Sequence, residues 1–471
     1  MSPVRELPSD AHVVNFGLPD FAAAISAQGA EAVQVDWSIP AGGDPASVGA
    51  LTTLYGSRSI AIDEANAEVV RRLDKGTPFL TGVAPARDVI PGMDGRMLLH
   101  AGPPISYEDV CDPMRRSMRA AVVAEGWAVD LSGAEDLLAR GVISLDAAND
   151  HGTVVPMVTA LGPTTPVWIA DNAEGGTRAF APVNQGPGDV AWFGRESQGA
   201  IDRLLFLRDV VQPRFARILD DVGPVDIMSL ASQGVQMGDD VHIRTQATTN
   251  LLIRNVLPAI ARLGKDPESV SMSEFLATSH LFFLTIAMAG AKSLTLAAEQ
   301  VEGGTVVTTM ARNGTTFGVK LAGSPTWHVC EAPTVGDALY YSGYSESDAA
   351  RDVGDSAVLE LVGLGGAAAA ASPAVAGFLG GSMDDAVRAT SEMTTICLAE
   401  STRFKLPILG FRGSPIAVDA RRVVETGVRP KVTTGVLHVS SGVGQIGAGV
   451  ATAPLEGFRE ALLLLAGGAP N

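Results

Sequence analysis

The chain has 471 residues, of which 46% are hydrophobic, and its 34 Lys and Arg against 52 Asp and Glu give a net charge of −18. Length and composition predict a globular protein of about three domains and exclude a disordered chain. A field of this sign repels nucleic acid and anionic lipid, so we expect neither nucleic acid nor membrane as a partner. A small anionic substrate would instead need local arginines, such as Arg244, Arg312 or Arg412.

The three cysteines are far apart and form no CxxC pair, which argues against a disulfide framework and a Cys-based zinc site. The first residues, MSPVRELPSD, lack the apolar core of a signal peptide, so we expect a cytoplasmic protein. Residues 361–383 form an uncharged run of near membrane-spanning length. The run is mostly Gly and Ala and contains Pro373, so we predict a small-residue helix packed inside the protein.

Residues 12–37 have the pattern strand, helix, strand, with Gly17 after the first strand. This pattern predicts a parallel-sheet unit, and we expect an N-terminal Rossmann-like α/β domain over residues 1–100. Only one glycine stands where a dinucleotide fingerprint has three, so a purely structural domain is the alternative to nucleotide binding. Residues 101–150 alternate short helical patterns with glycines and predict a small helical module.

Residues 151–300 predict an α+β domain with strands near 166–170 and 177–183 and helices over 201–221 and 274–298. The stretch LFFLTIAMAGAK is too apolar for a surface helix and should be buried, and His280 before it is predicted to be a hydrogen-bonded core residue.

Residues 301–471 predict a second α+β domain. Its clearest element is a hairpin over 305–322, because two β-branched runs flank Asn313-Gly314. Gly442, Gly444 and Gly447 formally match GxGxxG, but only a helix over 455–465 follows, so we predict a glycine loop that lines a site or an interface. The expected class is α/β and α+β multidomain, with a larger α+β C-terminal portion.

The loop 237–245 concentrates polar chemistry: Asp239, Asp240, His242 and Arg244 lie within six residues, just before a predicted helix. A loop that faces a polar ligand would account for this, with His242 and Asp239 as catalytic candidates and Arg244 as a substrate contact. The alternative is that the two aspartates are charges at the helix N-terminus. A Mg²⁺ site here is a weaker alternative, and we predict no bound metal.

Other segments add candidates for polar group transfer. His151 is a second candidate for proton transfer, with a structural role as its alternative. Arginines and glycine amides would hold carboxylate and carbonyl oxygens, although close helix packing would also explain the glycines at 363–366. The predicted substrate-binding residues are Arg244, Arg312, Asn313, Thr315, Arg412, Gly365, Gly366, Asn172, Asn184 and Gln445. No GxSxG, HExxH or GxxxxGK[ST] motif supports a serine hydrolase, zinc protease or P-loop NTPase.

Ten stretches run in order over nearly the whole chain: FGLPDFAAAISAQG, VDWSIPAGGD, LLHAGPPI, DHGTVVPM, QMGDDVHIR, TTMARNGTTFGV, GYSESDA, VGDSAVLELVGLGG, FRGSPIAVDARRVVETG and HVSSGVGQIGAG. In these stretches the sequence resembles the YlbE-like family, the AllG/YlbE-type subunits of the FdrA/YlbE/YlbF oxamate carbamoyltransferase system.

The resemblance implies partner subunits that are FdrA-like, similar to the alpha subunit of succinyl-CoA synthetase, and YlbF-like. It also implies exchange of a carbamoyl group between oxalurate and phosphate in purine and allantoin breakdown, giving oxamate and carbamoyl phosphate. Phosphate or carbamoyl phosphate would then be a co-substrate, and we expect no other cofactor. We further expect a homo-oligomer.

Three hypotheses follow. In the first, the chain is a carbamoyltransferase subunit that carries part of the active site. In the second, it is a scaffolding subunit with exposed apolar surface around the Ala-rich segment, residues 361–383. In the third, it is a metal-dependent amidohydrolase with its ion at Asp239, Asp240 and His242.

Overall fold

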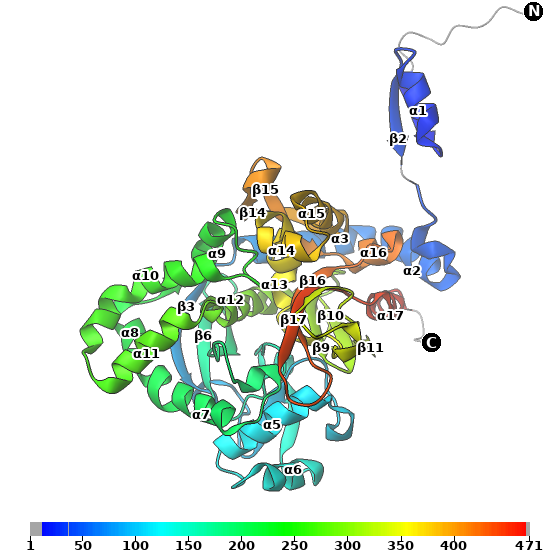
Figure 1. The fold of residues 1–471 in the computed structure, drawn as a ribbon. Helices are drawn as coiled ribbons and strands as arrows, with labels where there is room; N and C mark the ends of the chain where they lie inside the picture. The colour runs from blue at the N-terminus through cyan, green and yellow to red at the C-terminus, as the bar shows by residue number, and fades with distance from the viewer. Residues whose placement is uncertain (1–11, 36, 468–471) are drawn as a thin grey trace, which may run out of the picture.

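The computed structural model describes residues 12–35 and 37–467, which form a mixed α/β fold with several small sheets (Figure 1). The strands are β1 His12–Phe16, β2 Glu31–Val35, β3 Pro78–Pro85, β4 Met97–His100, β5 Ser144–Ala147, β6 Pro166–Asn172, β7 Thr177–Pro182, β8 Val225–Asp226, β9 Val307–Asn313, β10 Thr316–Leu321, β11 His328–Glu331, β12 Asp337–Tyr340, β13 Val353–Gly354, β14 Cys397–Leu406, β15 Arg412–Val418, β16 Lys431–Leu437 and β17 Gln445–Thr452.

The helices connect and cover these sheets. They are α1 Pro19–Ser26, α2 Pro45–Tyr55, α3 Ser59–Lys75, α4 Ala86–Val89, α5 Asp112–Ala124, α6 Leu131–Ala139, α7 Gln198–Phe206, α8 Gln212–Val222, α9 Ile227–Gln236, α10 Gln246–Leu263, α11 Pro267–Thr278, α12 Phe282–Glu299, α13 Val358–Leu361, α14 Pro373–Phe378, α15 Met383–Ile396, α16 Ala420–Thr426 and α17 Leu455–Leu465. Short 3₁₀ turns include η3 Ala148–His151, η4 Ala191–Phe193 and η7 Gly365–Ala371.

Most strand pairs are antiparallel. Two four-stranded sheets have the orders β7-β6-β3-β8 and β11-β10-β9-β13, and a three-stranded sheet has the order β12-β17-β16. β14 and β15 form a hairpin, whereas β1-β2 and β4-β5 are parallel pairs. The mixed class is therefore confirmed, and so is the hairpin predicted around Asn313-Gly314, which is β9-β10.

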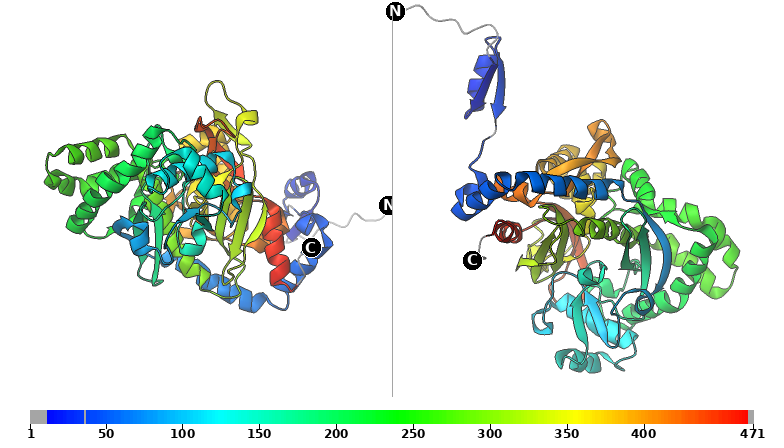
Figure 2. Two further views of the ribbon diagram at one scale, coloured as in Figure 1. Left: turned by 90° about the horizontal axis from the view of Figure 1, so that it is seen from below. Right: turned by 180° about the vertical axis from the view of Figure 1, so that it is seen from behind.

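The predicted Rossmann-like N-terminal domain is not confirmed. The strand, helix, strand pattern exists as β1-α1-β2, but its parallel sheet has only two strands among the described residues. The next strand, β3, pairs antiparallel with β6 and β8 in another sheet. Figure 1 and the right view of Figure 2 show the β1-α1-β2 unit apart from the body of the molecule. The partners of β3 are distant in sequence, which local patterns do not reveal. The predicted domain boundaries stay predictions.

The core is built around α12, whose residues are nearly all buried, as its apolar sequence predicts. α12 packs against β3, β6, β7, α3, α9 and α13. The indole of Trp168 donates a hydrogen bond to Thr285 Oγ1 at 3.1 Å, and its ring meets Phe215 and Phe282 edge to face. α12 is long and apolar enough to cross a membrane, but 89% of it is buried inside the chain, as in a core helix.

Two glycine-rich stretches differ from their predictions. Residues 445–452 form β17 instead of a loop, and a Cβ at Gly447 would lie 2.6 Å from the carbonyl oxygen of Leu339 on β12. Glycine here permits close approach of two backbones. The Ala-rich run is not one helix: it forms the buried 3₁₀ turn η7 and then α14, which begins at Pro373.

We predict that Gly366→Ala destabilises the fold, because the new Cβ would lie 2.1 Å from the carbonyl oxygen of Lys431 on β16. Such overpacking costs about 1–3 kcal/mol of unfolding free energy, measurable by urea unfolding. Gly377→Ala in α14 is the matched control, since its Cβ would meet no atom within 4 Å. Equal stability of the two variants would contradict this packing.

Candidate functional site

The loop 237–245 between α9 and α10 turns its carboxylates inward. Asp239 and Asp240 are both fully buried, and burial raises the pKa of each carboxyl group. Asp239 Oδ2 accepts hydrogen bonds from the amide of Thr248 at 2.8 Å and from its hydroxyl at 3.1 Å. Asp239 therefore holds the first turn of α10, as the helix-terminus alternative predicted, and does not face a ligand as a catalytic group would.

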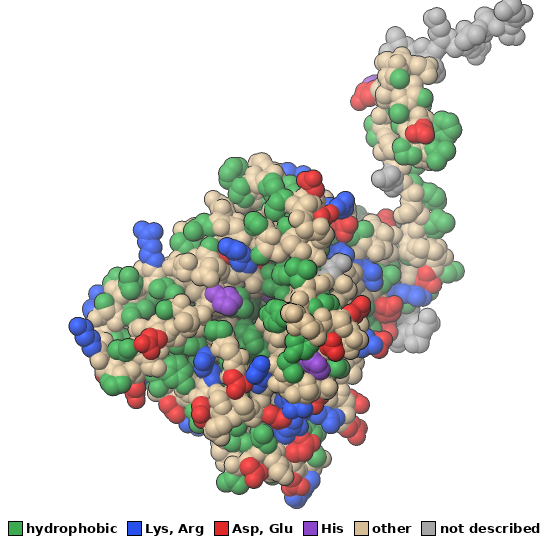
Figure 3. Space-filling model, in the orientation of Figure 1, with side chains coloured by type: hydrophobic (Ala, Val, Ile, Leu, Met, Phe, Trp, Pro, Cys, Tyr) green, Lys and Arg blue, Asp and Glu red, His purple; other side chains and the backbone are tan. Residues whose placement is uncertain are grey.

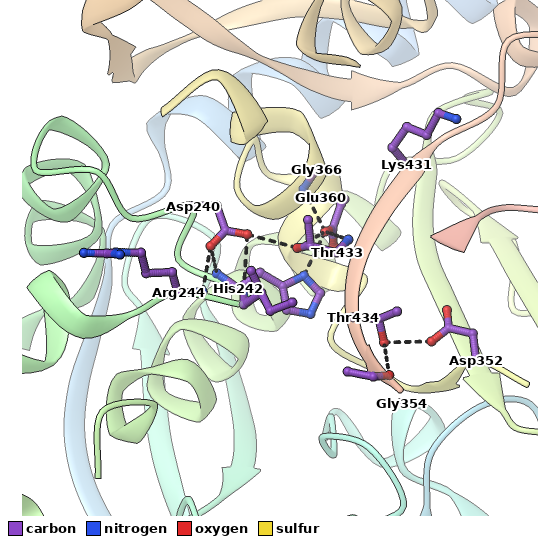
Figure 4. A network of polar contacts seen from close by, with 12 residues as sticks. Asp240, His242, Arg244, Asp352, Gly354, Glu360, Gly366, Lys431, Thr433 and Thr434 are labelled. Atoms are coloured by element: carbon purple, nitrogen blue, oxygen red, sulfur yellow. Dashed lines mark hydrogen bonds and ion pairs between the residues drawn. The ribbon is translucent and has the colours of Figure 1, made fainter. Parts of the chain in front are cut away.

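Asp240 shapes the turn that carries the histidine. Its Oδ1 accepts from the amide of Arg244 at 2.8 Å, and its Oδ2 accepts from the hydroxyl of Thr433 at 3.0 Å (Figure 4). Val241 lies within this turn with φ of 61°, a left-handed conformation that is rare for a β-branched residue. Strain of this kind persists only where the surroundings enforce it and is typical of functional sites.

The imidazole of His242 is anchored by a buried carboxylate. Its Nδ1 lies 2.8 Å from Glu360 Oε1, and Glu360 has no exposed surface. The same oxygen accepts from the amides of Gly366 at 3.0 Å and Thr433 at 3.1 Å. A carboxylate at Nδ1 favours the tautomer with the proton there, which leaves Nε2 as the free acceptor. Among the described residues Nε2 makes no hydrogen bond.

The glycines behind the histidine serve close packing. A Cβ at Gly365, where φ is 57°, would lie 2.1 Å from Glu360 Oε1 and 2.9 Å from His242 Nδ1. The amide of Gly365 donates to the carbonyl of Asp240 at 2.7 Å, and that of Gly366 donates to Glu360. Both amides thus bind the protein itself instead of a ligand anion, contrary to the substrate-binding role predicted for them.

His242 faces a cleft that opens at the surface. The outer part has a volume of about 430 Å³, and a deeper extension adds about 50 Å³. The two parts share Trp192, Phe193, Ile243, Leu281 and Gln445, so they form one continuous cleft.

Polar groups sit at both ends of this mostly apolar cleft. His242, Ser356 and Thr434 line the deep end. Arg195 and His280 line the mouth, where His280 is exposed instead of buried in the core as predicted. Apolar walls with a few convergent polar groups are typical of a small-molecule site.

Arg195 is the guanidinium that lines the cleft, and no sequence motif indicated it. Its side chain is 40% exposed and lies 3.6 Å from Asp189 Oδ1, a loose ion pair. A Cβ at Gly444 would lie 2.9 Å from Arg195 Nε, so the glycine-rich turn before β17 makes room for this side chain. Such a cation is free to bind an anionic ligand at the mouth.

Of the predicted site residues, His242 and Gln445 line the cleft. Asn184 is buried and does not line the cleft; its Oδ1 accepts from the amide of Gly186, which does, at 2.8 Å. Arg244 is directed away from the histidine ring and lies 3.4 Å from Asp239 Oδ1 (Figure 4).

His151 lies outside the cleft, with its Nε2 2.9 Å from Asp146 Oδ2. Asn172 is also remote and accepts from the amide of Thr77 at 3.1 Å. Arg412 pairs with Glu400 on the exposed hairpin β14-β15, 3.1 Å from its Oε1. These three positions do not support the predicted catalytic or substrate-binding roles.

Arg312 was predicted to bind a substrate anion, but its side chain is fully buried and its guanidinium is hydrogen-bonded within the protein. Its guanidinium donates to both oxygens of Asp352, at 2.7 and 3.2 Å, and to the carbonyl of Gly354 at 2.7 Å. Asn313 Oδ1 accepts from the amide of Thr315 at 3.0 Å, and the hydroxyl of Thr315 donates to the carbonyl of Asp109 at 2.9 Å. The hairpin turn is therefore a structural element.

The metal-site alternative lacks converging ligands. The oxygens of Asp239 and Asp240 point to separate amides, and Nδ1 of His242 points to Glu360. Within residues 12–35 and 37–467 no group of three His, Cys, Asp or Glu side chains has an arrangement that could hold a metal ion.

Comparisons with known proteins show which family this chain is similar to. A family model described as oxamate carbamoyltransferase subunit AllG matches residues 143–356. Two relatives come from Escherichia coli (strain K12). The uncharacterized protein YahG is 35% identical over 455 residues, 96% of each chain. Oxamate carbamoyltransferase subunit AllG is 36% identical over 411 residues, 86% of this chain and 98% of that one.

A solved structure shares the fold. It is the crystal structure of a conserved protein of unknown function from Enterococcus faecalis V583, which has a TM-score of 0.84 and 35% identity and covers 87% of this chain and 99% of its own.

We predict effects of different size on stability for Arg312 and Arg412, which the sequence analysis grouped as substrate-binding residues. Arg312→Ala leaves Asp352 charged and buried without its partner, which costs about 3–5 kcal/mol of unfolding free energy. Arg412→Ala removes an exposed pair and should change stability by less than about 1 kcal/mol. Urea or thermal unfolding of the two variants tests this, and a small effect at Arg312 would disagree with its observed role.

Proposed function

Because this chain belongs to the AllG family, we propose that it is a carbamoyltransferase subunit that carries part of the active site. The proposed substrate is a small ureido compound with a carboxylate, and the reaction converts oxalurate and phosphate to oxamate and carbamoyl phosphate in allantoin-related nitrogen catabolism. The observation that carries the proposal is the imidazole of His242, held by buried Glu360 at the floor of the cleft.

The reaction needs one proton to move. A phosphate oxygen attacks the terminal carbonyl carbon of oxalurate, the bond from that carbon to the oxamate nitrogen breaks, and that nitrogen gains a proton. The proton that phosphate loses balances the one that the nitrogen gains. An amide nitrogen is a poor leaving group unless it is protonated as it departs, so a proton carrier near neutral pH is the main chemical requirement.

His242 suits this role by position. With its Nδ1 proton directed at Glu360, Nε2 accepts the phosphate proton and then delivers it to the leaving nitrogen. Glu360 stabilises the imidazolium formed between these steps and fixes the ring's orientation, as a carboxylate does in other acid–base pairs. Positioning of the two substrates in the cleft supplies further acceleration without a covalent enzyme intermediate.

The cleft suits a planar, polar substrate of this size. Trp192 and Phe193, whose rings stack on each other with centroids 4.5 Å apart, line the cleft with aromatic surface. Ser356, Thr434 and Gln445 line the cleft. Thr434 donates its hydroxyl proton to Asp352 at 2.8 Å and Gln445 donates its amide to the carbonyl of Gly447 at 3.0 Å, so we propose that their oxygens accept from the amide groups of the substrate. Arg195 at the mouth is the proposed partner of the substrate carboxylate.

The scaffolding alternative predicted exposed apolar surface around the Ala-rich segment. Ala367, Ala368, Ala369 and Ala370 are buried instead. The polar floor of the cleft also favours a chain that contributes to catalysis over a purely structural subunit.

We predict that His242→Asn lowers kcat by about 10²–10⁴-fold, the usual contribution of a general acid–base. The assay measures carbamoyl phosphate formed from oxalurate and phosphate by this chain with its FdrA-like and YlbF-like subunits. His151→Asn is the matched control and should stay within about threefold of the wild type, since it lies outside the cleft. Loss of activity in the control alone, or in neither variant, would contradict the site.

We predict that Arg195→Met raises the KM for oxalurate by about 10–100-fold, the loss expected when a charged hydrogen bond to a carboxylate is removed, with a smaller change in kcat. Arg178→Met is the control, because Arg178 pairs with Asp171 on the sheet β7-β6. An unchanged KM for oxalurate but a raised KM for phosphate would reassign Arg195 to the second substrate.

A further inference from the structure

The deep end of the cleft contains a hydroxyl group that the fold does not use. Ser356 lines this end and is 4% exposed, and its hydroxyl makes no hydrogen bond within the described part of the chain. A serine hydroxyl normally has a partner when it is buried, because leaving it unpaired costs free energy. The Ser356 hydroxyl is therefore free to donate to a ligand in the cleft.

The backbone around Ser356 is fixed on both sides. The buried carboxylate of Asp355 accepts hydrogen bonds from the amides of Gly102 at 2.8 Å and Val155 at 3.0 Å. The carbonyl of Ser356 accepts from the amide of Leu359 at 3.0 Å. A donor that is held in place before the substrate binds stabilises charge effectively, since it needs no reorganisation.

A second unused donor belongs to the wall of the same end. Trp192 is 2% exposed and lines both parts of the cleft, and its indole Nε1 has no hydrogen-bond partner among the described residues. By contrast, the buried indole of Trp168 donates to Thr285. A buried N–H without an acceptor destabilises the fold, and a ligand oxygen at the deep end would supply one. Hydrogen bonds of this kind often form fully only in the complex with substrate.

The deep end also offers an acceptor. Both oxygens of Asp352 accept from the guanidinium of Arg312, so this carboxylate acts as an acceptor. The hydroxyl of Thr434 therefore donates its proton to Asp352, 2.8 Å away, and its oxygen keeps lone pairs for a donor in the cleft. Two donors and an acceptor at one end match a carbonyl oxygen beside an NH₂ group, which is the pattern of a carbamoyl group.

Size and charge orient the substrate between the two ends of the cleft. The deep part holds about 50 Å³, against about 30 Å³ for one water molecule in the liquid, so it admits a small planar group. None of the described residues that line it is Arg or Lys, whereas Arg195 lines the mouth. Basic and acidic side chains are interspersed over the face drawn in Figure 3, so no broad positive surface there would hold a carboxylate. The substrate carboxylate therefore belongs at Arg195, and the uncharged end belongs in the deep part.

We propose that the deep end of the cleft is a carbamoyl pocket, in which Ser356 Oγ and Trp192 Nε1 donate to the carbonyl oxygen and Thr434 Oγ1 accepts from the NH₂ group. This assignment rests on the proposed carbamoyltransferase function. When a phosphate oxygen bonds to the carbonyl carbon, one electron pair of the C=O bond moves onto the carbonyl oxygen, and both donors stabilise that negative charge. The pair returns when the bond from this carbon to the oxamate nitrogen breaks, so neither donor is consumed.

Ser356→Ala and Trp192→Phe should each lower kcat by about 10²–10³-fold, the usual effect of removing one donor to such an oxygen, with a much smaller change in the KM for phosphate. The assay measures carbamoyl phosphate formed by this chain with its FdrA-like and YlbF-like subunits. Ser391→Ala on the exposed face of α15 and Trp327→Phe, whose Nε1 donates to Asp150 outside the cleft, are the matched controls and should leave kcat unchanged. Thermal unfolding checks that each variant is folded.

Nuclear magnetic resonance detects the Trp192 contact in the unaltered chain without turnover. The chain has five tryptophans, so ¹⁵N labelling of tryptophan gives few indole signals, and the one that Trp192→Phe removes belongs to Trp192. Oxalurate added without phosphate should shift this signal, because a carbonyl oxygen becomes the acceptor of the indole N–H. The signal of Trp327, identified in the same way, should stay in place.

The pocket also predicts selectivity for carbamoyl over acetyl groups. N-acetyloxamate has a methyl group where oxalurate has NH₂, so Thr434 Oγ1 loses its donor. We expect kcat/KM for this analogue to be roughly 100-fold lower or less, since a site that hydrogen-bonds a polar group rejects an analogue that lacks it. Equal use of the two compounds would contradict the acceptor role of Thr434.

Three results would overturn the carbamoyl pocket: wild-type kcat in Ser356→Ala or Trp192→Phe, a Trp192 indole signal that does not move while oxalurate binds, or a carbamoyl group retained on Ser356 in mass spectra, which would make this residue a nucleophile. The proposed reaction fails in a different way. A chain that binds oxalurate through Trp192 but forms no carbamoyl phosphate with its partner subunits contradicts the reaction and keeps the pocket. Wild-type turnover in the two variants contradicts the pocket and keeps the reaction.

Discussion

The candidate site depends on one buried carboxylate, that of Glu360. Its Oε1 accepts hydrogen bonds from His242 Nδ1 and from the amides of Gly366 and Thr433, which come from three separate segments of the chain. A buried charge costs several kcal/mol unless hydrogen bonds compensate it, so these three segments must meet for the fold to accept Glu360. The same bonds that satisfy Oε1 of Glu360 therefore aim the imidazole at the cleft.

Close backbone approach is what permits this arrangement. Side chains at Gly365 and Gly366 would collide with Glu360 and with β16, and Asp240 holds Val241 in a left-handed conformation beside them. The site is thus rigid before any substrate arrives, which is the condition under which acid–base groups act efficiently.

Some charged side chains stabilise the fold, and others are accessible to a ligand. The chain carries an excess of acidic residues, and Arg312 is buried in an ion pair with Asp352. Arg195 is bound only loosely, so a ligand carboxylate competes for it easily. An acidic protein can therefore hold an anionic substrate where one cation stays available at the mouth of an apolar cleft.

The sequence by itself determined the elements whose signals are local. The hairpin at Asn313-Gly314, the buried helix α12 and the β1-α1-β2 pattern follow from turn chemistry and periodicity. His242 could be predicted as a candidate because it lies in a short loop with other polar residues. Which polar residues face a ligand was decided by tertiary structure. Arg312, Gly365 and Asp239 have the residue types of a binding site but satisfy buried partners. Glu360 becomes a candidate only through its contact with the distant His242, and Arg195 only because folding places it at the mouth of the cleft. Burial and long-range pairing, which no local pattern encodes, separate a structural charge from a functional one.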